Sequence, residues 1–427
     1  MANTTTAVVE MLKYAYGVNR LQYMFNQESV VYNILGKVKK PMGGRGQFIL
    51  PVIVQNAGAF TGIAEGGALP TALDMDTAEA TFSLQEFVAV YTMSWKLIQD
   101  SRNDKFAFQQ ATTALDESVR RRVLRNLNAD FLDDGRGRLA VMSAVDDGAG
   151  VFTSNYLPRL EKGMVVDIMS NSDDDTKRGD SLTVNGVDPV TNQVTLSAAV
   201  TGESAGDYAV IQDTTDVSIS SVALHTNGLL GIISNANPAS VVGNFGGINR
   251  STAGNEYWKA PLLSNSGTNR ALTEDLLLQA MDAVRVKGGG QVKAWISNLP
   301  ILRRYHEMLT AERYVSLSQA QPLSGGFGRK GAGEKNEDGT TPYEFSGVPW
   351  HVDPFFQNNT VIGMDTDHFF IGVGENDVPR PVSEIFDNVP NLKYTANATF
   401  DVNWYYQCEV LSDMPSAGVQ IQDVAEA

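Results

Sequence analysis

The chain has 427 residues, of which 43% are hydrophobic and 19% are charged, and its formal net charge is −16. At about 150 residues per domain, this length predicts two or three structural units. The charged fraction lies below the roughly 25% of ordinary soluble domains, which predicts that part of the surface contacts protein. The acidic balance excludes tight nucleic-acid binding, because duplex affinity depends on basic patches.

Cysteine content and the N-terminal sequence bear on the compartment. The single cysteine, Cys408, excludes an intrachain disulfide and fits a reducing compartment or a large core. The opening residues MANTTTAVVEMLKYAYG lack the basic start, the long apolar run and the cleavage site of a signal peptide. No stretch approaches the roughly 20 apolar residues that cross a bilayer. We therefore expect a cytosolic protein with no membrane partner.

Residues 1–44 are predicted to form an N-terminal arm, and residues 45–95 are predicted to form an extended β-hairpin. The arm combines a partly helical apolar spacing with a basic end and has little to bury. The hairpin has two arms, 47–54 and 79–95, rich in β-branched and aromatic residues, around a tip rich in Gly and Ala. Pro51 lacks a ladder donor, so its arm is not a central strand.

A two-stranded hairpin is marginally stable by itself, so we expect its missing face to be another molecule. The burial of about six large side chains against a neighbour is worth at most on the order of 10 kcal/mol per subunit. The predicted intersubunit interface consists of nine apolar residues: Phe48, Leu50, Ile53, Val54, Phe60, Ile63, Leu69, Phe82 and Val88.

A single long helix is predicted from about Asp104 to Asp133, because six apolar residues recur on one face: Phe108, Leu115, Val119, Val123, Leu127 and Phe131. Such a helix is about 45 Å long at 1.5 Å per residue. It also carries four arginines, Arg120, Arg121, Arg122 and Arg125. These could face nucleic acid or a neighbouring subunit. We favour ion pairs within the helix, from Asp116 to Arg120 and from Glu117 to Arg121.

Residues 150–217 change in composition and predict an inserted β-rich accessory domain. The segment 184–197 has the turn residues of a hairpin, and GDYAVIQ adds a further strand. The acidic run 173–175 with Asp180 lacks the glycine and glutamate positions of an EF-hand loop, which favours a solvated turn over a calcium site.

From Thr273 the pattern becomes α/β. Thr273 is the expected N-cap of a helix that ends near Gly288, followed by a strand in QVKAWISN and a second helix in LPILRRYHEMLTAERYV. The loop 323–342 contains GFGRKG, which neither follows a strand nor opens a helix and so does not indicate a dinucleotide site. Near the C-terminus, FDVNWYYQCEV alternates as a half-buried strand with Cys408 in the core.

The sequence predicts no catalytic residue, no metal site and no cofactor. The four histidines, His225, His306, His351 and His368, show no metal-binding spacing. The group of Asp365, Asp367 and His368 is more simply a turn with a solvated histidine. An enzyme would require catalytic residues brought together from distant positions, so we expect that the protein is not an enzyme.

The order of these parts, together with the segments YNILGKVKK, GRGQFILPV, AEGGALP, MSWKLIQDS and INRSTAGNEYWKA, resembles the major capsid proteins of tailed bacteriophages. The resemblance covers nearly the whole chain except residues 150–217. It implies the α+β Hong Kong 97-type capsid fold. Its divisions here are an arm (1–44), an extended loop (45–95), a peripheral domain with the spine helix (96–149, 218–269 and 376–427), the insertion (150–217) and an axial domain (270–375).

The resemblance also implies a function, namely a self-assembling subunit of an icosahedral virion capsid, assembled in the host cytoplasm. Its partners would be copies of itself in hexamers and pentamers, separate scaffolding and portal proteins, a possible decoration protein, and packaged double-stranded DNA contacted weakly and without sequence specificity. An encapsulin-like compartment shell and a β-rich binding module or enzyme stay open as alternatives. Some members of the family crosslink a loop lysine to a neighbouring asparagine, but no lysine lies between Lys40 and Lys96 here.

Overall fold

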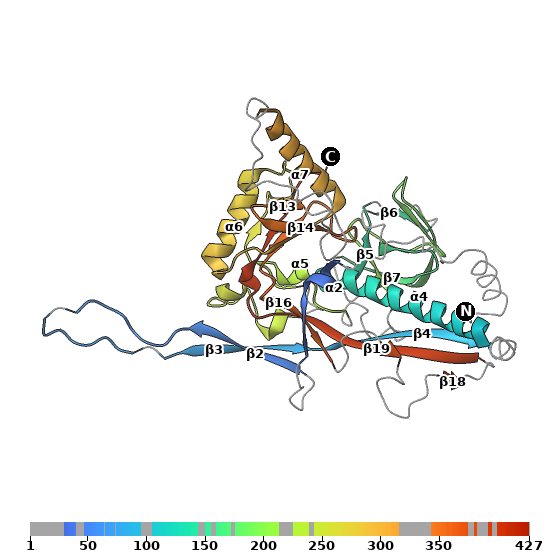
Figure 1. The fold of residues 1–427 in the computed structure, drawn as a ribbon, viewed down its shortest axis with the longest axis horizontal. Coiled ribbons are helices and arrows are strands. Elements are labelled where there is room, and N and C mark those ends of the chain that lie inside the picture. Colours follow the sequence, from blue (N-terminus) through green and yellow to red (C-terminus); the bar gives the residue numbers. More distant parts are fainter. Residues whose placement is uncertain are drawn as a thin grey trace.

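The computed structural model of the chain describes residues 30–39, 47–63, 65–72, 74–94, 105–143, 150–154, 159–171, 176–212, 225–238, 243–315, 343–374, 380–381, 392–394 and 399–426. In this part of the chain, three six-stranded β-sheets form the body (Figure 1). A two-stranded hairpin projects far beyond them. The mixture of helices and sheets confirms the predicted α+β class.

The first sheet is built around one long strand, β19 (Thr399–Ser412). Its antiparallel neighbours are β16 (Phe369–Val373) and β4 (Gln85–Ser94), and β1 (Gly36–Lys39) runs parallel to β16. Two short strands, β17 (Arg380–Pro381) and β18 (Leu392–Tyr394), also pair with β19. The alternation predicted for β19 is confirmed as far as Cys408, with Val402, Trp404, Tyr406 and Cys408 buried. Beyond it the strand is buried on both faces, and Glu409, expected on the exposed face, is 1% exposed.

Helix α4 (Lys105–Phe131) is the predicted long helix, and its 27 residues correspond to about 40 Å. It lies alongside β4 and β19 (Figure 1). Its C-terminal residues Leu127 and Phe131 enter the largest core, where α2 (Val30–Ile34) and α5 (Leu229–Ile232) also pack. Nearer the N-terminus of α4, Leu115 and Val119 pack against a smaller cluster on β4 and β19. One apolar face therefore holds the helix against the first sheet, as predicted.

The second sheet has the strand order β11-β20-β15-β12-β14-β13. Its strands are β11 (Leu262–Leu263), β12 (Ala294–Ser297), β13 (Tyr343–Phe345), β14 (Val348–Val352), β15 (Val361–Met364) and β20 (Gly418–Ile421). Helices α6 (Glu274–Gly288) and α7 (Leu299–Val315) pack on it. The Thr273 hydroxyl accepts the backbone N–H of Leu276 at 3.3 Å, which confirms the predicted N-cap.

The third sheet has the order β5-β10-β7-β8-β9-β6 and encloses a core of its own. Its strands are β5 (Arg138–Val141), β6 (Val151–Thr153), β7 (Val165–Met169), β8 (Lys177–Asp188), β9 (Gln193–Leu196) and β10 (Tyr208–Ile211). The predicted hairpin is the β8–β9 pair, with Asn192 at φ 55° in its turn. The insertion is therefore β-rich, as predicted, but β5 joins its sheet from upstream of residue 150.

Strand pairing also departs from the other expected divisions. β1 comes from the predicted arm but belongs to the first sheet, and so does β16 from the predicted axial segment. Conversely, β20 comes from the C-terminal segment but lies in the second sheet between β11 and β15. Each of these three strands therefore pairs in a sheet other than the one expected for its sequence segment, because its partner strands are distant in the chain. Residues 1–29, residues 173–175 and the loop 323–342 lie outside the described part.

Candidate assembly surface

The projecting hairpin is formed by β2 (Gln47–Gln55) and β3 (Asp76–Ser83), with Phe48 opposite Phe82 and Leu50 opposite Ala80. The predicted return arm, 79–95, was expected to be one strand, and this is wrong. After Leu84 the chain continues as β4, which pairs with β19 rather than with β2. The hairpin is therefore anchored at its base to the first sheet.

The base of the hairpin is buried in the subunit itself. Phe48, Leu50 and Phe82 are only 2%, 7% and 3% exposed. Their assignment to an interface with another molecule is therefore wrong, because segments far away in the sequence already cover them. Val52 is partly buried against the same core. The half of the hairpin next to the body therefore packs one face against the core of its own subunit.

Aromatic stacking fixes this base. The ring of Phe82 lies 4.9 Å from that of Phe245, which in turn stacks on Trp258 at 5.7 Å. The indole N–H of Trp258 donates to the carbonyl of Phe245 at 2.9 Å. Gly246 has φ 63°, and a Cβ there would approach the Phe82 ring to 3.0 Å. Glycine is thus required where the 245–247 turn, η4 (Phe245–Gly247), meets β3.

Arg250 holds the same region together from inside. The side chain is completely buried, and it donates to the carbonyls of Trp258, Gly231, Ala236 and Ile232. Burial lowers the pKa of Arg250 to about 10. No role was predicted for Arg250 from the sequence, although it lies in the segment INRSTAGNEYWKA. Asn249, Ser251 and Thr252 flank Arg250 in the sequence, so no local apolar pattern marked it as buried.

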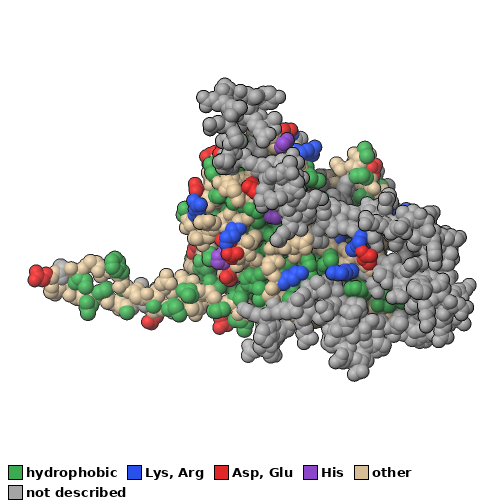
Figure 2. Space-filling view, viewed as in Figure 1, with side chains coloured by type: hydrophobic (Ala, Val, Ile, Leu, Met, Phe, Trp, Pro, Cys, Tyr) green, Lys and Arg blue, Asp and Glu red, His purple; other side chains and the backbone are tan. Residues whose placement is uncertain are grey.

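The tip of the hairpin differs sharply from its base. Phe60 is 104% exposed and Leu69 83%, while Ile53 and Ile63 are 60% and 47% exposed. Val54 is partly exposed. Figure 2 shows hydrophobic side chains gathered along this projection, away from the body. The described chain leaves these five residues at least partly accessible, and their role in an interface stays a prediction.

All the charged side chains of the hairpin are negative. Residues 47–83 carry four carboxylates, Glu65, Asp74, Asp76 and Glu79, and no lysine or arginine. Exposed apolar side chains between carboxylates suit a partner surface that offers an apolar depression and positive charge.

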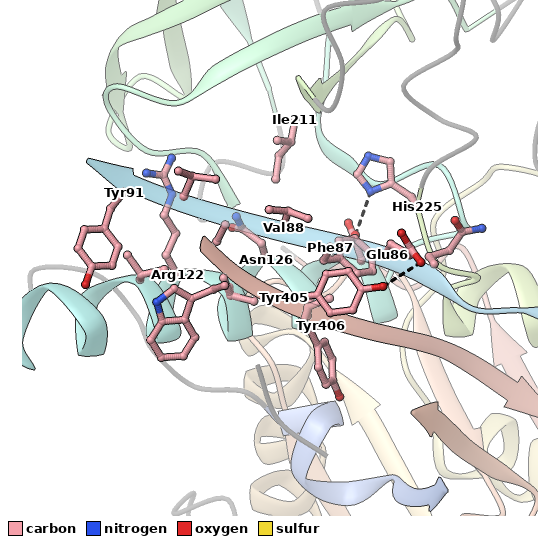
Figure 3. A pocket seen from close by; sticks show the side chains of 18 of the residues that line it. Glu86, Phe87, Val88, Tyr91, Arg122, Asn126, Ile211, His225, Tyr405 and Tyr406 are labelled. Carbon is pink, nitrogen blue, oxygen red and sulfur yellow. Dashed lines mark hydrogen bonds and ion pairs between the residues drawn. The ribbon is translucent and has the colours of Figure 1, made fainter. Parts of the chain in front are cut away.

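Val88, the ninth predicted interface residue, lies on β4 and not on the hairpin. Its side chain is 62% exposed beside a groove of about 700 Å³. The groove runs between β4 and α4 (Figure 3). Phe87, Val88 and Val123 provide apolar lining, and Arg122 lines it from α4. The groove is a second accessible surface on which apolar and basic groups adjoin.

Asp130 and His225, which both line this groove, pair with each other, and the buried Glu409 is close to Asp130. His225 Nδ1 lies 2.9 Å from Asp130 Oδ2, and Glu409 accepts the backbone N–H of Asn227 at 2.7 Å. Burial, and secondarily the nearby Asp130, raise the pKa of Glu409 to about 8. Burial also raises the pKa of the Cys408 thiol, which lies in the core as predicted.

The other candidate groups form local pairs with neighbouring side chains. Asp365 and Asp367 both pair with Lys293, and His368, in a turn as predicted, lies 3.0 Å from Asp413. Within the described residues, no three His, Cys, Asp or Glu side chains are arranged to hold a metal ion. The described helices include none that is long and apolar enough to span a membrane.

No protein-family model matches the sequence, and no curated protein matches it. Solved structures match over nearly the whole chain. A chain of the cyanophage A-1(L) capsid asymmetric unit is 12% identical, with a TM-score of 0.56 over 95% of this chain and 96% of that chain. The capsid of a native GTA particle gives 11% identity and a TM-score of 0.46, covering 96% of both chains. The SrpI encapsulin of Synechococcus elongatus PCC 7942 gives 8% and 0.46, covering 97% and 96%.

At these identities the likeness concerns the fold, and it rests on the cyanophage structure, whose TM-score exceeds 0.5. The chain shares the fold of that capsid chain over 95% of its length. The expected Hong Kong 97-type capsid fold is thereby confirmed. The separate limits of the arm, the peripheral and axial domains and the insertion stay predictions.

Proposed function

We propose that this chain is the structural subunit of an icosahedral phage capsid, which assembles into hexamers and pentamers around a double-stranded DNA genome. The observation that carries this proposal is the projecting hairpin, whose Phe60 and Leu69 are almost fully exposed on a capsid-type fold. A monomer rarely leaves such side chains on a long projection in water unless a partner covers them. A shell of identical subunits supplies that partner.

The same proposal defines the other partners. The net charge of −16 favours weak, sequence-independent contact with packaged DNA. Separate scaffolding and portal proteins, and possibly a decoration protein, would complete the particle, which forms in the host cytoplasm. This role requires no catalytic residue.

Electron microscopy of the purified protein tests the proposal. We expect closed icosahedral shells or capsomers, with mass photometry showing particles far above the 46.3 kDa chain. A monodisperse monomer over a range of salt and protein concentrations would contradict it. Shells that enclose a co-purified protein cargo and assemble identically without any phage component would instead indicate an encapsulin-like compartment.

A further inference from the structure

In the described part of the chain, charged side chains join the third sheet to the rest of the subunit. The buried apolar cluster that fills this sheet contains only residues between 139 and 209. Outside that cluster, Arg125 of α4 pairs with Glu161, and Arg159 lies 3.7 Å from Asp133, just after α4. Units that meet through polar contacts move relative to each other more readily than units that share a core. The charges at this joint therefore decide how firmly the third sheet is held.

The chain enters the third sheet directly after α4 and returns to the body at His225. Residues 225–230, which we call the latch segment, lie against the end of α4. The imidazole of His225 lies against Gly137, where φ is 65° and any side chain would overlap the ring. Gly228 is held just as closely against the carbonyl of Asp133, and the N–H of Leu230 donates to that carbonyl at 3.1 Å. The latch segment therefore ties the two connections of the third sheet to each other.

Three buried titratable side chains meet at the latch segment. His225 Nδ1 lies 2.9 Å from Asp130 Oδ2 (Figure 3), and the N–H of Asn227 donates to the Glu409 carboxyl group at 2.7 Å. Asp130, His225 and Glu409 are only 4%, 8% and 1% exposed. Two carboxyl groups that lie close together and away from water cannot both ionise without a large free-energy cost. The latch segment therefore closes over Glu409 most favourably while Glu409 carries a proton.

The groups around Glu409 supply no compensating cation in the described part of the chain. On α4 the charged neighbour is Asp130, which is itself paired with His225. On β19 the neighbour is Cys408, whose thiol stays neutral because burial raises its pKa. On the adjoining strands, Gly372 of β16 faces Glu409 and Gln85 of β4 faces Cys408, and neither titrates. A negative charge on Glu409 is therefore opposed mainly by the N–H groups of Asn227 and Val410.

We propose that Asp130, His225 and Glu409 form a proton-controlled latch between the third sheet and the body. While Glu409 holds its proton, the latch segment stays on α4 and β19. Loss of the proton draws water to Glu409 and releases the segment. The return connection of the third sheet then loosens while all three sheets remain folded. The latch lies within one subunit and is independent of the proposed shell.

Proton linkage fixes the direction and the range of the response. Burial raises the pKa of Glu409 to about 8 in the closed latch, with a further contribution from Asp130, against about 4.3 in water. Between these values opening releases a proton, so the open fraction rises with pH, by at most about tenfold per pH unit. Above about pH 8 the closed latch has lost its proton as well, and the response levels off.

Hydrogen exchange of the full-length protein tests the latch, because a bonded amide exchanges when its segment opens. The protection factors of the Asn227 and Leu230 amides, corrected for the intrinsic pH dependence of exchange, should fall at least about tenfold between about pH 6 and pH 8 and then level off. The amides of Val184 and Leu196 donate to carbonyls inside the third sheet, and they should stay better protected at every pH.

Two variants and a control assign the response to Glu409. Glu409→Gln keeps an acceptor for Asn227 but has no proton to lose, so protection in the latch segment should not change with pH. Asp130→Asn removes the neighbouring charge, and its response should level off at a lower pH. Glu256 is exposed and also accepts a backbone N–H, from Gly254 at 2.9 Å, so Glu256→Gln should leave the response unchanged.

Three results would overturn the latch. The first is protection of Asn227 and Leu230 that stays constant from about pH 6 to pH 8 in the unchanged protein. The second is an unchanged pH response in Glu409→Gln, which would assign the proton to another group such as His225. The third is equal protection of the latch amides and of Val184 and Leu196, which would mean that the chain opens as a whole. Where Glu409→Gln yields too little folded protein, an identical pH profile in Asp130→Asn and the unchanged protein would contradict the coupling of the two carboxyl groups.

Discussion

The β2–β3 hairpin and the third sheet both leave the main core, yet they end in opposite environments. The third sheet surrounds its own apolar cluster, in which Val166, Ile168, Val184 and Val194 are completely buried. The hairpin is buried at its base but exposes Phe60 and Leu69 at its tip. A segment that closes its own core adds a stable unit. A segment that leaves large apolar side chains uncovered is completed by another molecule.

The largest expected effect comes from removing the tip. Replacing residues 56–75 with a two-residue Asn-Gly turn joins β2 to β3 directly, a connection that hairpins favour. We expect a folded subunit with unchanged helical circular dichroism and a complete loss of shells by electron microscopy. The tip contributes nothing to the described core, so its loss removes only contacts between molecules. Normal shells from this variant would contradict the assigned role of the tip.

A matched pair of phenylalanines divides the hairpin into its two parts. Phe82→Ala removes a buried ring that packs on Phe245, and it should lower the free energy of unfolding by about 3–5 kcal/mol. Phe60→Ala removes an exposed ring and should change stability by less than about 0.5 kcal/mol while impairing assembly. Urea unfolding and shell yield measured on both variants check this. A large stability loss from Phe60→Ala would mean that the tip packs within its own subunit.

The sequence predicted those features that depend on local signals. The alternation along β19, the N-cap at Thr273 and the apolar face of α4 are each visible in a few consecutive residues. The base of the hairpin was misjudged because its cover is remote. Phe245 and Trp258 lie more than 150 residues after Phe82, and Gln85 pairs with Cys408 across more than 300 residues. Apolar pattern predicts that a side chain is buried, but it does not identify the segment that buries it.

For the candidate site, composition indicated that the tip residues are exposed, because a segment rich in Gly and Ala cannot cover Phe60 or Leu69 itself. Composition did not distinguish these exposed residues from Phe48, Leu50 and Phe82, which are buried within the subunit. The groove beside Val88 could not be predicted from the sequence either, because it is formed by β4 and α4 together with residues such as Ile211 and His225. Only tertiary packing brings those segments to one place.

The third sheet can be loosened where it joins the body. Arg159 is buried there, donates to the carbonyl of Phe355 at 2.7 Å and lies 3.7 Å from Asp133. Burial alone would raise the pKa of Asp133, but the guanidinium groups of Arg138 and Arg159 together lower it. Arg159→Met removes one of the two guanidinium groups that stabilise the buried Asp133 carboxylate. The variant should therefore lower the free energy of unfolding by about 3 kcal/mol.

Lys162→Met, at an exposed position nearby, is the control and should cost less than about 0.5 kcal/mol. Chemical denaturation of both variants measures the difference. Equal stabilities would show that the third sheet is held by its apolar contacts alone, and that Arg159 has no special part in joining it to α4.

The most gradual effect, spread over several pH units, concerns Glu409, which is buried on β19 near Asp130 of the groove lining. The pKa of Glu409 in the folded chain is about 8, against about 4.3 for an unperturbed glutamate. Between these values the folded state binds a proton that the unfolded state has released. This contribution makes the free energy of unfolding fall as pH rises from about 4.3 to 8, by at most about 1.4 kcal/mol per pH unit.

Glu409→Gln removes the titration while its amide oxygen can still accept the N–H of Asn227. The other ionisable groups there, Asp130, His225 and Cys408, are unchanged in the variant, so the difference between the two proteins isolates Glu409. We expect the variant to gain stability relative to the unchanged protein as pH rises from 5 to 8, and the difference to level off above about pH 8. A stability difference that does not change with pH would show that Glu409 is ionised in the folded subunit and that water reaches it despite its burial.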